Sequence, residues 1–244
     1  MRKLIFIMTA LCSVCLLCGC NADSDTQGEV ETIPEQAENQ ENQEIPTVNL
    51  EEYPTSKPPE ETIVPNGTEI DAGATPLEQF VYEIHTDGTA VILDFNGSDT
   101  ELVITSQIGG YPVTEIGQYA FEASWNVTSI VLPETIEIIN EQAFADCESL
   151  TEINIPEQVK FIGRGAFSNC MSLTELTLPA SLTDTNEEML TNCIALQDLY
   201  ILNSDLNYKN WGLEESETKC TIHATSGAEI LSWAEQNDFP TAIE

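Results

Sequence analysis

Residues 150–170 read LTEINIPEQVKFIGRGAFSNC, and versions of this stretch recur every 23 residues between Ile116 and Ile201. A fixed period in the twenties, kept by several positions at once, is typical of a solenoid in which each copy forms one rung. We therefore predict a stack of 23-residue rungs. The five columns are Phe121, Phe144, Phe167 and Leu190; Ser124, Cys147, Cys170 and Cys193; Pro133, Pro156 and Pro179; Ile130, Ile153, Leu176 and Leu199; and Leu132, Ile155, Leu178 and Ile201.

Each rung has a readable order of local structure. Ile153 and Ile155 alternate with polar residues, as in a strand with one apolar face, and Pro156 then ends the strand because it lacks an N–H group. Gly163 marks a turn, and the apolar spacing over residues 166–173 predicts a helical turn that leads to the next strand. One rung cannot bury its own apolar face, so we expect rungs to stack at the strand spacing of about 4.8 Å.

The order of strand and Pro, Ile-Gly, Ala-Phe and Cys in residues 150–170 resembles the BspA-like leucine-rich repeat family of bacterial surface proteins. The resemblance extends over roughly residues 80–244 and implies an α/β repeat, a leucine-rich-repeat solenoid that acts by contact and without catalysis. The third copy departs from the pattern. Thr185 replaces the inward Ile there, and Met189-Leu190 replaces Ala-Phe, which predicts less regular last rungs.

The N-terminal residues look like an export signal. Arg2 and Lys3 precede an apolar segment that is too short for a permanent membrane span, and the segment ends Leu17-Cys18-Gly19-Cys20. This ending resembles the bacterial lipoprotein processing box, which implies a lipid on Cys20 and a protein anchored at the cell membrane and exposed outside the cytoplasm. An ordinary cleaved leader is the alternative.

Composition divides the rest of the chain. Residues 21–76 are rich in Glu, Gln, Asn, Thr and Pro, so we expect a disordered acidic linker with a reach on the order of 40 Å. Binding of a basic partner is the alternative reading of this linker. The predicted organisation is a lipoprotein signal peptide at 1–20, this linker at 21–76, a β-rich N-terminal cap at 77–115, and the solenoid with a helical C-terminal cap at 116–244.

Both caps have local signals. In the N-terminal cap, Asp87-Gly88 predicts a tight turn between two strands, and Asn96-Gly97 predicts another hairpin turn, although residues 94–99 faintly resemble a calcium loop. At the other end, a strand at 221–223 precedes an amphipathic helix at 228–237. Solenoids need such ends, because an open end exposes apolar surface.

The charge restricts the partners. The chain has 42 acidic and 7 basic residues and a formal net charge of −35, so it repels nucleic acid and anionic lipid. Catalysis is also not indicated, since His85 and His223 are the only histidines and the familiar nucleophile, zinc and phosphate motifs are absent from the sequence. We expect no cofactor. An enzyme site in the irregular loop 203–219 is a rival without a nucleophile-and-base pair.

Cys147, Cys170 and Cys193 fall on consecutive rungs. Ser124 holds the same position in the first rung, which fits a requirement for a small side chain better than a requirement for a ligand. We therefore expect buried thiols, with a bridge between rungs or a metal as alternatives.

The outward face of the repeat strands is the candidate binding surface, for a protein or polysaccharide ligand. Its acidic column could also attract a cationic group or, weakly, a divalent ion, unless the column merely reflects the overall acidity. A scaffold for a partner in the producer's own envelope is the alternative function. The candidate ligand-binding residues are Glu152, Asn154, Glu175, Thr177, Asp198 and Tyr200.

Overall fold

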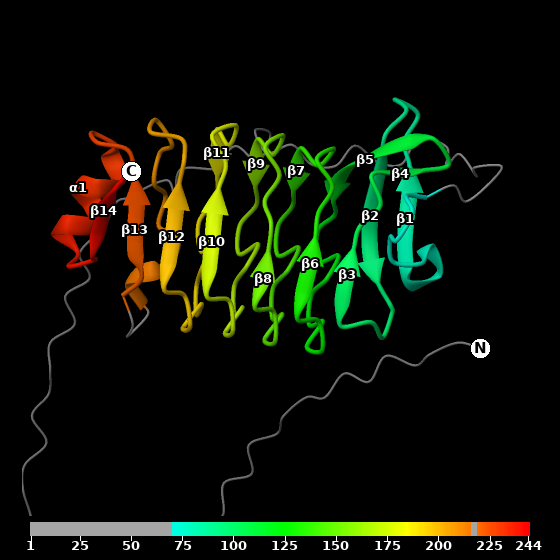
Figure 1. The fold of residues 1–244 in the computed structure, drawn as a ribbon, viewed down its shortest axis with the longest axis horizontal. Coiled ribbons are helices and arrows are strands. Elements are labelled where there is room, and N and C mark those ends of the chain that lie inside the picture. Colours follow the sequence, from blue (N-terminus) through cyan, green and yellow to red (C-terminus); the bar gives the residue numbers. More distant parts are fainter. Residues whose placement is uncertain (1–69, 216–218) are drawn as a thin grey trace, which may run out of the picture. The chain divides into compact units, whose positions relative to one another are not determined.

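The structure, a computed structural model, describes residues 70–215 and 219–244 (Figure 1). The expected signal peptide with Cys20, and the expected linker up to residue 69, lie outside the described residues. Two rows of short strands run through the described part, and each row takes one strand from each rung (Figure 1). The chain is therefore a leucine-rich-repeat solenoid with a spacing of about 23 residues, as predicted.

The first row begins with an antiparallel pair, and its later strands pair in parallel along the path β2-β5-β7-β9-β11. Its strands are β1 (Phe80–Ile84), β2 (Ala90–Phe95), β5 (Tyr111–Ile116), β7 (Ile138–Ile139), β9 (Phe161–Ile162) and β11 (Asp184–Thr185), and β4 (Gln107–Ile108) pairs with β5.

The second row is parallel throughout its paired strands, and β8 lies next to β10 where its two sheets meet (Figure 1). Its strands are β3 (Glu101–Val103), β6 (Ser129–Val131), β8 (Glu152–Ile153), β10 (Glu175–Leu178), β12 (Asp198–Ile201), β13 (Thr221–Ala224) and β14 (Thr241–Ile243).

A third ladder of hydrogen bonds joins the turns of neighbouring rungs. The N–H groups of Phe121 and Phe144 donate to the carbonyl oxygens of Ala143 and Ala166, each at 2.8 Å. The next rungs repeat the contact, from Phe167 to Met189 and then from Leu190 to Trp211. Each rung is thus held to its neighbour at three places around its circumference, which satisfies backbone groups that would otherwise be buried without partners.

The helical turn predicted at 166–173 is wrong, and so is the α/β class for the rungs. Each rung makes consecutive tight turns instead, because two residues per rung adopt a left-handed backbone that an α-helix cannot contain. Within the described residues the one α-helix is α1 (Glu229–Gln236), and η1 (Leu77–Gln79) and η2 (Leu213–Glu215) are short 3₁₀ turns. The left-handed columns are Tyr119, Gln142, Gly165 and Glu188; and Ala123, Asp146, Asn169 and Asn192.

The apolar columns form one continuous core. Phe121, Phe144 and Phe167 stack with ring centroids 5.1 and 5.4 Å apart, and Phe95 extends the stack at 5.8 Å from Phe121. The predicted strand columns, from Ile130 to Leu199 and from Leu132 to Ile201, are buried as well. Burial of large side chains in register supplies the main stabilisation of such a stack.

Trp211 explains why the third copy can carry Thr185 at an inward position. Its fully buried indole N–H donates to Thr185 Oγ1 at 3.0 Å, and Thr185 itself is 1% exposed. Thr185 pairs with Ile162 at the inward position of β11, so the rung stays in register although the residue is polar. A buried hydroxyl needs such a partner, and the irregular loop provides it.

The two ends differ from the middle. At the N-terminal end, β1 covers the free edge of β2, and the Asp87-Gly88 turn forms as predicted. Asn96-Gly97 is not a hairpin turn, because β2 pairs with β5 and the following β3 pairs with β6. The expected cap at 77–115 therefore contains two strands that pair in parallel with later rungs.

At the C-terminal end a single helix, α1, follows β13, and β14 then pairs in parallel with β13. Ile230 and Ala234 on α1 are buried. Tyr208 from the irregular loop stacks at 4.1 Å from Trp233 of α1, so the loop is packed against this end.

The cysteine column is buried and unbridged. Cys147, Cys170 and Cys193 are free thiols, and their Sγ atoms donate to the carbonyl oxygens of Phe121, Phe144 and Phe167 at 3.2–3.3 Å. Burial raises the pKa of Cys147 and of Cys193 to about 12 and raises that of Cys170 well above its ordinary value. A thiol in this state is a poor nucleophile.

We expect the native protein to label at these three cysteines at least ~100-fold more slowly than the protein in guanidinium, because reaction requires the rung to open. Mass spectrometry after iodoacetamide treatment at pH 8 measures each site separately. Labelling of the native column at the rate of the unfolded chain would contradict the buried arrangement.

Candidate binding surface

The outward side chains of the second row form two columns that the strand register aligns. Pairing of β3 with β6, β6 with β8, β10 with β12 and β12 with β13 fixes the neighbours, and the 23-residue repeat relates β8 to β10. We call these two columns the strand face. The first column is Glu101, Ser129, Glu152, Glu175, Asp198 and Thr221, and the second is Val103, Val131, Asn154, Thr177, Tyr200 and His223.

All six candidate ligand-binding residues lie on the strand face. Glu175 is directly opposite Asp198, and Thr177 is directly opposite Tyr200. Glu152, Asn154 and Glu175 are exposed, and the other three are half-buried. The structure thus brings the predicted residues together as neighbours, which is the arrangement that a contact surface requires.

Asn154 also has a role within the fold. Its Oδ1 accepts a hydrogen bond from the Leu132 N–H at 2.7 Å, and its Nδ2 donates to the Leu132 carbonyl at 2.9 Å. The side-chain amide thereby continues the β6–β8 ladder for one further residue by imitating a backbone peptide. Two of its hydrogen-bonding positions are consequently occupied before any ligand arrives.

His223 completes the C-terminal end of the strand face, and the sequence interpretation missed it. Its Nε2 lies 2.8 Å from Asp198 Oδ1, its Nδ1 lies 2.9 Å from Glu244 Oε1, and its ring stacks on Tyr200 at 4.1 Å. Its side chain is only 14% exposed. The 23-residue repeat could have identified His223 as part of the strand face, because it follows Tyr200 by 23 residues in the same column.

The charges around His223 change its titration. The hydrogen bond to Asp198, together with that to Glu244, raises the pKa of His223 above its ordinary value, and burial opposes this increase. Burial and the negative charges of Asp198, Glu175 and Glu244 raise the pKa of Tyr200. The protonated His223 therefore offsets part of the acidic charge at this end of the strand face.

The basic side chains of the described ranges are occupied by partners within the solenoid. Lys160, Arg164 and Lys209 pair with acidic residues of neighbouring rungs at 2.6–2.8 Å, and Lys219 lies 4.2 Å above the Phe239 ring. These exposed pairs contribute little stability individually. They leave the strand face acidic, which favours a cationic or neutral ligand over an anionic one.

Two further observations concern metals and membranes. Among residues 70–215 and 219–244, no three His, Cys, Asp or Glu side chains are grouped so that they could hold a metal ion, so the weak divalent-ion binding expected here stays a prediction. In the same ranges, no helix has both the length and the apolar character needed to span a bilayer.

Comparisons with known proteins agree with the repeat geometry. Residues 114–226 match the family described as BspA type Leucine rich repeat region in six copies, so this part of the chain is a repeat region of that family. It is a family of bacterial surface proteins, which is consistent with a binding role.

Solved structures show the same repeat. The Leucine Rich Repeat protein of T. pallidum (TpLRR) is 27% identical, with a TM-score of 0.57 over 62% of this chain and 71% of that chain. A leucine-rich repeat protein from Bacteroides capillosus ATCC 29799 is 31% identical over 52% of this chain and 97% of its own, with a TM-score of 0.46. The Pneumococcal vaccine antigen PcpA, 21% identical with a TM-score of 0.51 over 66% of this chain and 46% of its own, shows the fold alone. No protein of curated function matches the chain.

We expect NMR titration to give His223 a pKa above the ordinary value of about 6.5, and the Asp198→Asn variant to lower it, because this substitution removes the negative partner. Asp184→Asn is the matched control, since Asp184 pairs with Lys209 on another strand. An unchanged titration in Asp198→Asn would show that the hydrogen bond does not form in solution.

The same pair has a consequence for stability. Because the folded-state pKa is raised, the contribution of protonated His223 is fully present below the unfolded pKa of about 6.5 and is lost as pH rises through the folded value. His223→Gln should therefore lower the free energy of unfolding more at pH 6 than at pH 9. Urea denaturation at both pH values measures the difference, and equal effects at the two pH values would argue against the linkage.

Proposed function

We propose that this chain is an exported, lipid-anchored protein that binds a protein or a polysaccharide outside the cytoplasm through the strand face. The observation that carries the proposal is the register of that face. From β3 to β13, two columns of outward side chains lie next to each other, outside the apolar core. Parallel columns of this kind present an extended surface for another macromolecule.

The strand face is graded along its length, which supports recognition of an extended ligand. Its N-terminal end carries exposed apolar side chains, Val103 at 40% and Val131 at 49% exposure. Its C-terminal end carries Glu175, Asp198 and the Tyr200–His223 stack. An apolar end and an acidic aromatic end offer contacts of different chemistry to one ligand, and such variation provides specificity.

The proposed anchor depends on the sequence before residue 70. We propose that the Leu17-Cys18-Gly19-Cys20 box supplies the attachment site at Cys20 and that the acidic segment after it serves as the linker. Such a linker lets the repeat domain meet ligands away from the lipid surface. Adhesion to host or neighbouring cells is the role that best uses this arrangement.

A glycan and extracellular-protein array, probed with the mature chain, tests the proposal. We expect one ligand class to bind, and the Glu152→Lys/Glu175→Lys variant to lose at least ~10-fold in affinity, because it reverses two adjacent charges on the strand face. The matched control is Glu134→Lys/Glu157→Lys, which changes the net charge equally at exposed positions of neighbouring rungs outside the strand face.

The array results separate three explanations. Equal losses in the two variants would mean that only the overall charge matters, and unchanged binding in both would move the site elsewhere. Capture of proteins from the producer's own envelope, with no array ligand, would favour the scaffold role over adhesion.

A further inference from the structure

A groove opens on the turn side of the solenoid, between the tight turns of three consecutive rungs. Its volume is about 380 Å³, which lies within the range of ordinary ligand sites. The side chains that line it are polar or charged, and they lie on turn segments apart from the strand face. The residues that matter are Glu141, Arg164, Ser168, Asn169, Glu188 and Asn192.

Gly165 forms part of the wall of the groove, at a position where the neighbouring rungs carry long side chains. Gly165 belongs to the left-handed column in which Gln142 precedes it and Glu188 follows it, and its φ is 59°. A Cβ at Gly165 would lie 3.2 Å from Gln142 Cγ and 3.5 Å from Ser168 Oγ, so a side chain there would crowd two residues that line the groove. The spacing identifies the Gly-Arg-Gly segment at 163–165 as a variation of the repeat, and its Arg164 and Gly165 line the groove.

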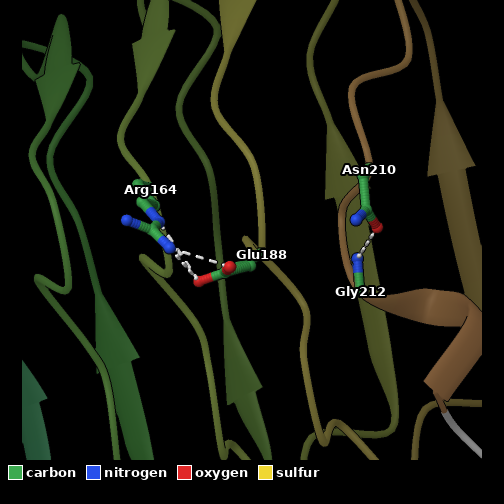
Figure 2. A network of polar contacts seen from close by, with 4 residues as sticks. All are labelled: Arg164, Glu188, Asn210 and Gly212. Carbon is green, nitrogen blue, oxygen red and sulfur yellow. Dashed lines mark hydrogen bonds and ion pairs between the residues drawn. The ribbon is translucent and has the colours of Figure 1, made fainter. Parts of the chain in front are cut away.

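A guanidinium is fixed at the rim of the groove. Arg164 Nη2 donates to Glu188 Oε1 at 2.8 Å and to Oε2 at 2.9 Å, and its Nε donates to Oε2 at 3.1 Å (Figure 2). The third nitrogen, Nη1, points away from Glu188 (Figure 2) and takes no part in the ion pair. The pair therefore orients two N–H donors toward other acceptors while most of the Arg164 charge is compensated.

A file of side-chain amides runs along the neighbouring left-handed column. Asn169 Nδ2 donates to Asp146 Oδ1 at 2.6 Å, and Asn192 Nδ2 donates to Asn169 Oδ1 at 2.8 Å. Each amide nitrogen has a second N–H group, and the Asn192 carbonyl can accept. Because the three residues share one backbone conformation, the file presents donors and acceptors at the spacing of the rungs.

These groups suit a neutral, hydroxyl-rich ligand. The carboxylates of Glu141 and Glu188 disfavour an anion, whereas the N–H groups of Arg164 Nη1 and of the side-chain amides need acceptors, which a simple cation does not provide. Each sugar hydroxyl can donate to a carboxylate and accept from an amide or guanidinium at the same time. We propose that this groove binds a segment of a neutral oligosaccharide, an inference that rests on the proposed extracellular binding function and names a second site for it.

Calorimetry of the full mature chain with cellotetraose, maltotetraose, mannotetraose and tetralysine tests the proposal. We expect one tetrasaccharide to bind saturably below about 10 mM. Gly165→Gln should weaken that binding at least ~10-fold by placing a side chain at the groove wall, and its thermal melt measures the cost of a side chain at the left-handed φ of 59° beside Gln142. Asn169→Ala should weaken binding without filling the groove. Lys209→Gln, which breaks an ion pair between rungs outside the groove, is the matched control and should bind normally.

The outcomes separate this inference from the proposed function. Loss of tetrasaccharide binding in Gly165→Gln with an unchanged thermal melt supports the groove. Tetralysine binding in place of sugar binding, no saturable sugar binding, or full binding by Gly165→Gln overturns it. In each of these contrary cases, array binding that depends on Glu152 and Glu175 would leave the proposed function standing.

Discussion

The hydrogen-bond ladders between rungs are the constraint on which the rest of this structure depends. Backbone groups of one rung pair with those of the next in both strand rows and in the turns, so every rung must have nearly the same length. Equal length places each inward side chain over its counterpart, and Phe121, Phe144 and Phe167 stack as a result. Where the pattern breaks, as at Thr185, a substitute partner restores both the packing and the polar balance through Trp211.

The register of the buried columns also determines the positions of the outward side chains. The outward side chains are free to vary in identity, because the ladders and the core hold the backbone without them. Their positions are nevertheless fixed, since the same register that aligns the core columns aligns them. The strand face, the Asp198–His223–Glu244 contacts and the hydrogen-bonded row of Asp146, Asn169 and Asn192 all arise this way. A repeat protein can therefore change its surface chemistry one rung at a time without disturbing its fold.

The features that recur in every strand column could be predicted from the sequence. The turn conformations and the side-chain contacts between particular rungs could not be predicted as well. The 23-residue period gave the solenoid, the buried columns and the outward position of Glu152, Glu175 and Asp198. It did not give the tight turns, because only Gly165, Asp146, Asn169 and Asn192 among the left-handed residues carry a recognisable preference for that conformation. The partners of Asn154, Thr185 and His223 depend on side-chain contacts across rungs, and the groove is lined by turn residues that differ from rung to rung, so neither follows from periodicity alone.

Deletion of one whole rung tests the register most directly. Removal of residues 151–173 joins Leu150 to Thr174, which is the counterpart of Thr151 in the next rung. The account therefore predicts a shorter protein with a β-type circular dichroism spectrum, one cooperative melt and protected thiols at Cys147 and Cys193. Removal of residues 151–170 shifts every later column by three positions and should abolish cooperative melting. Equal folding of the two deletions, or failure of the whole-rung deletion alone, would contradict the claim that register between rungs holds this fold together.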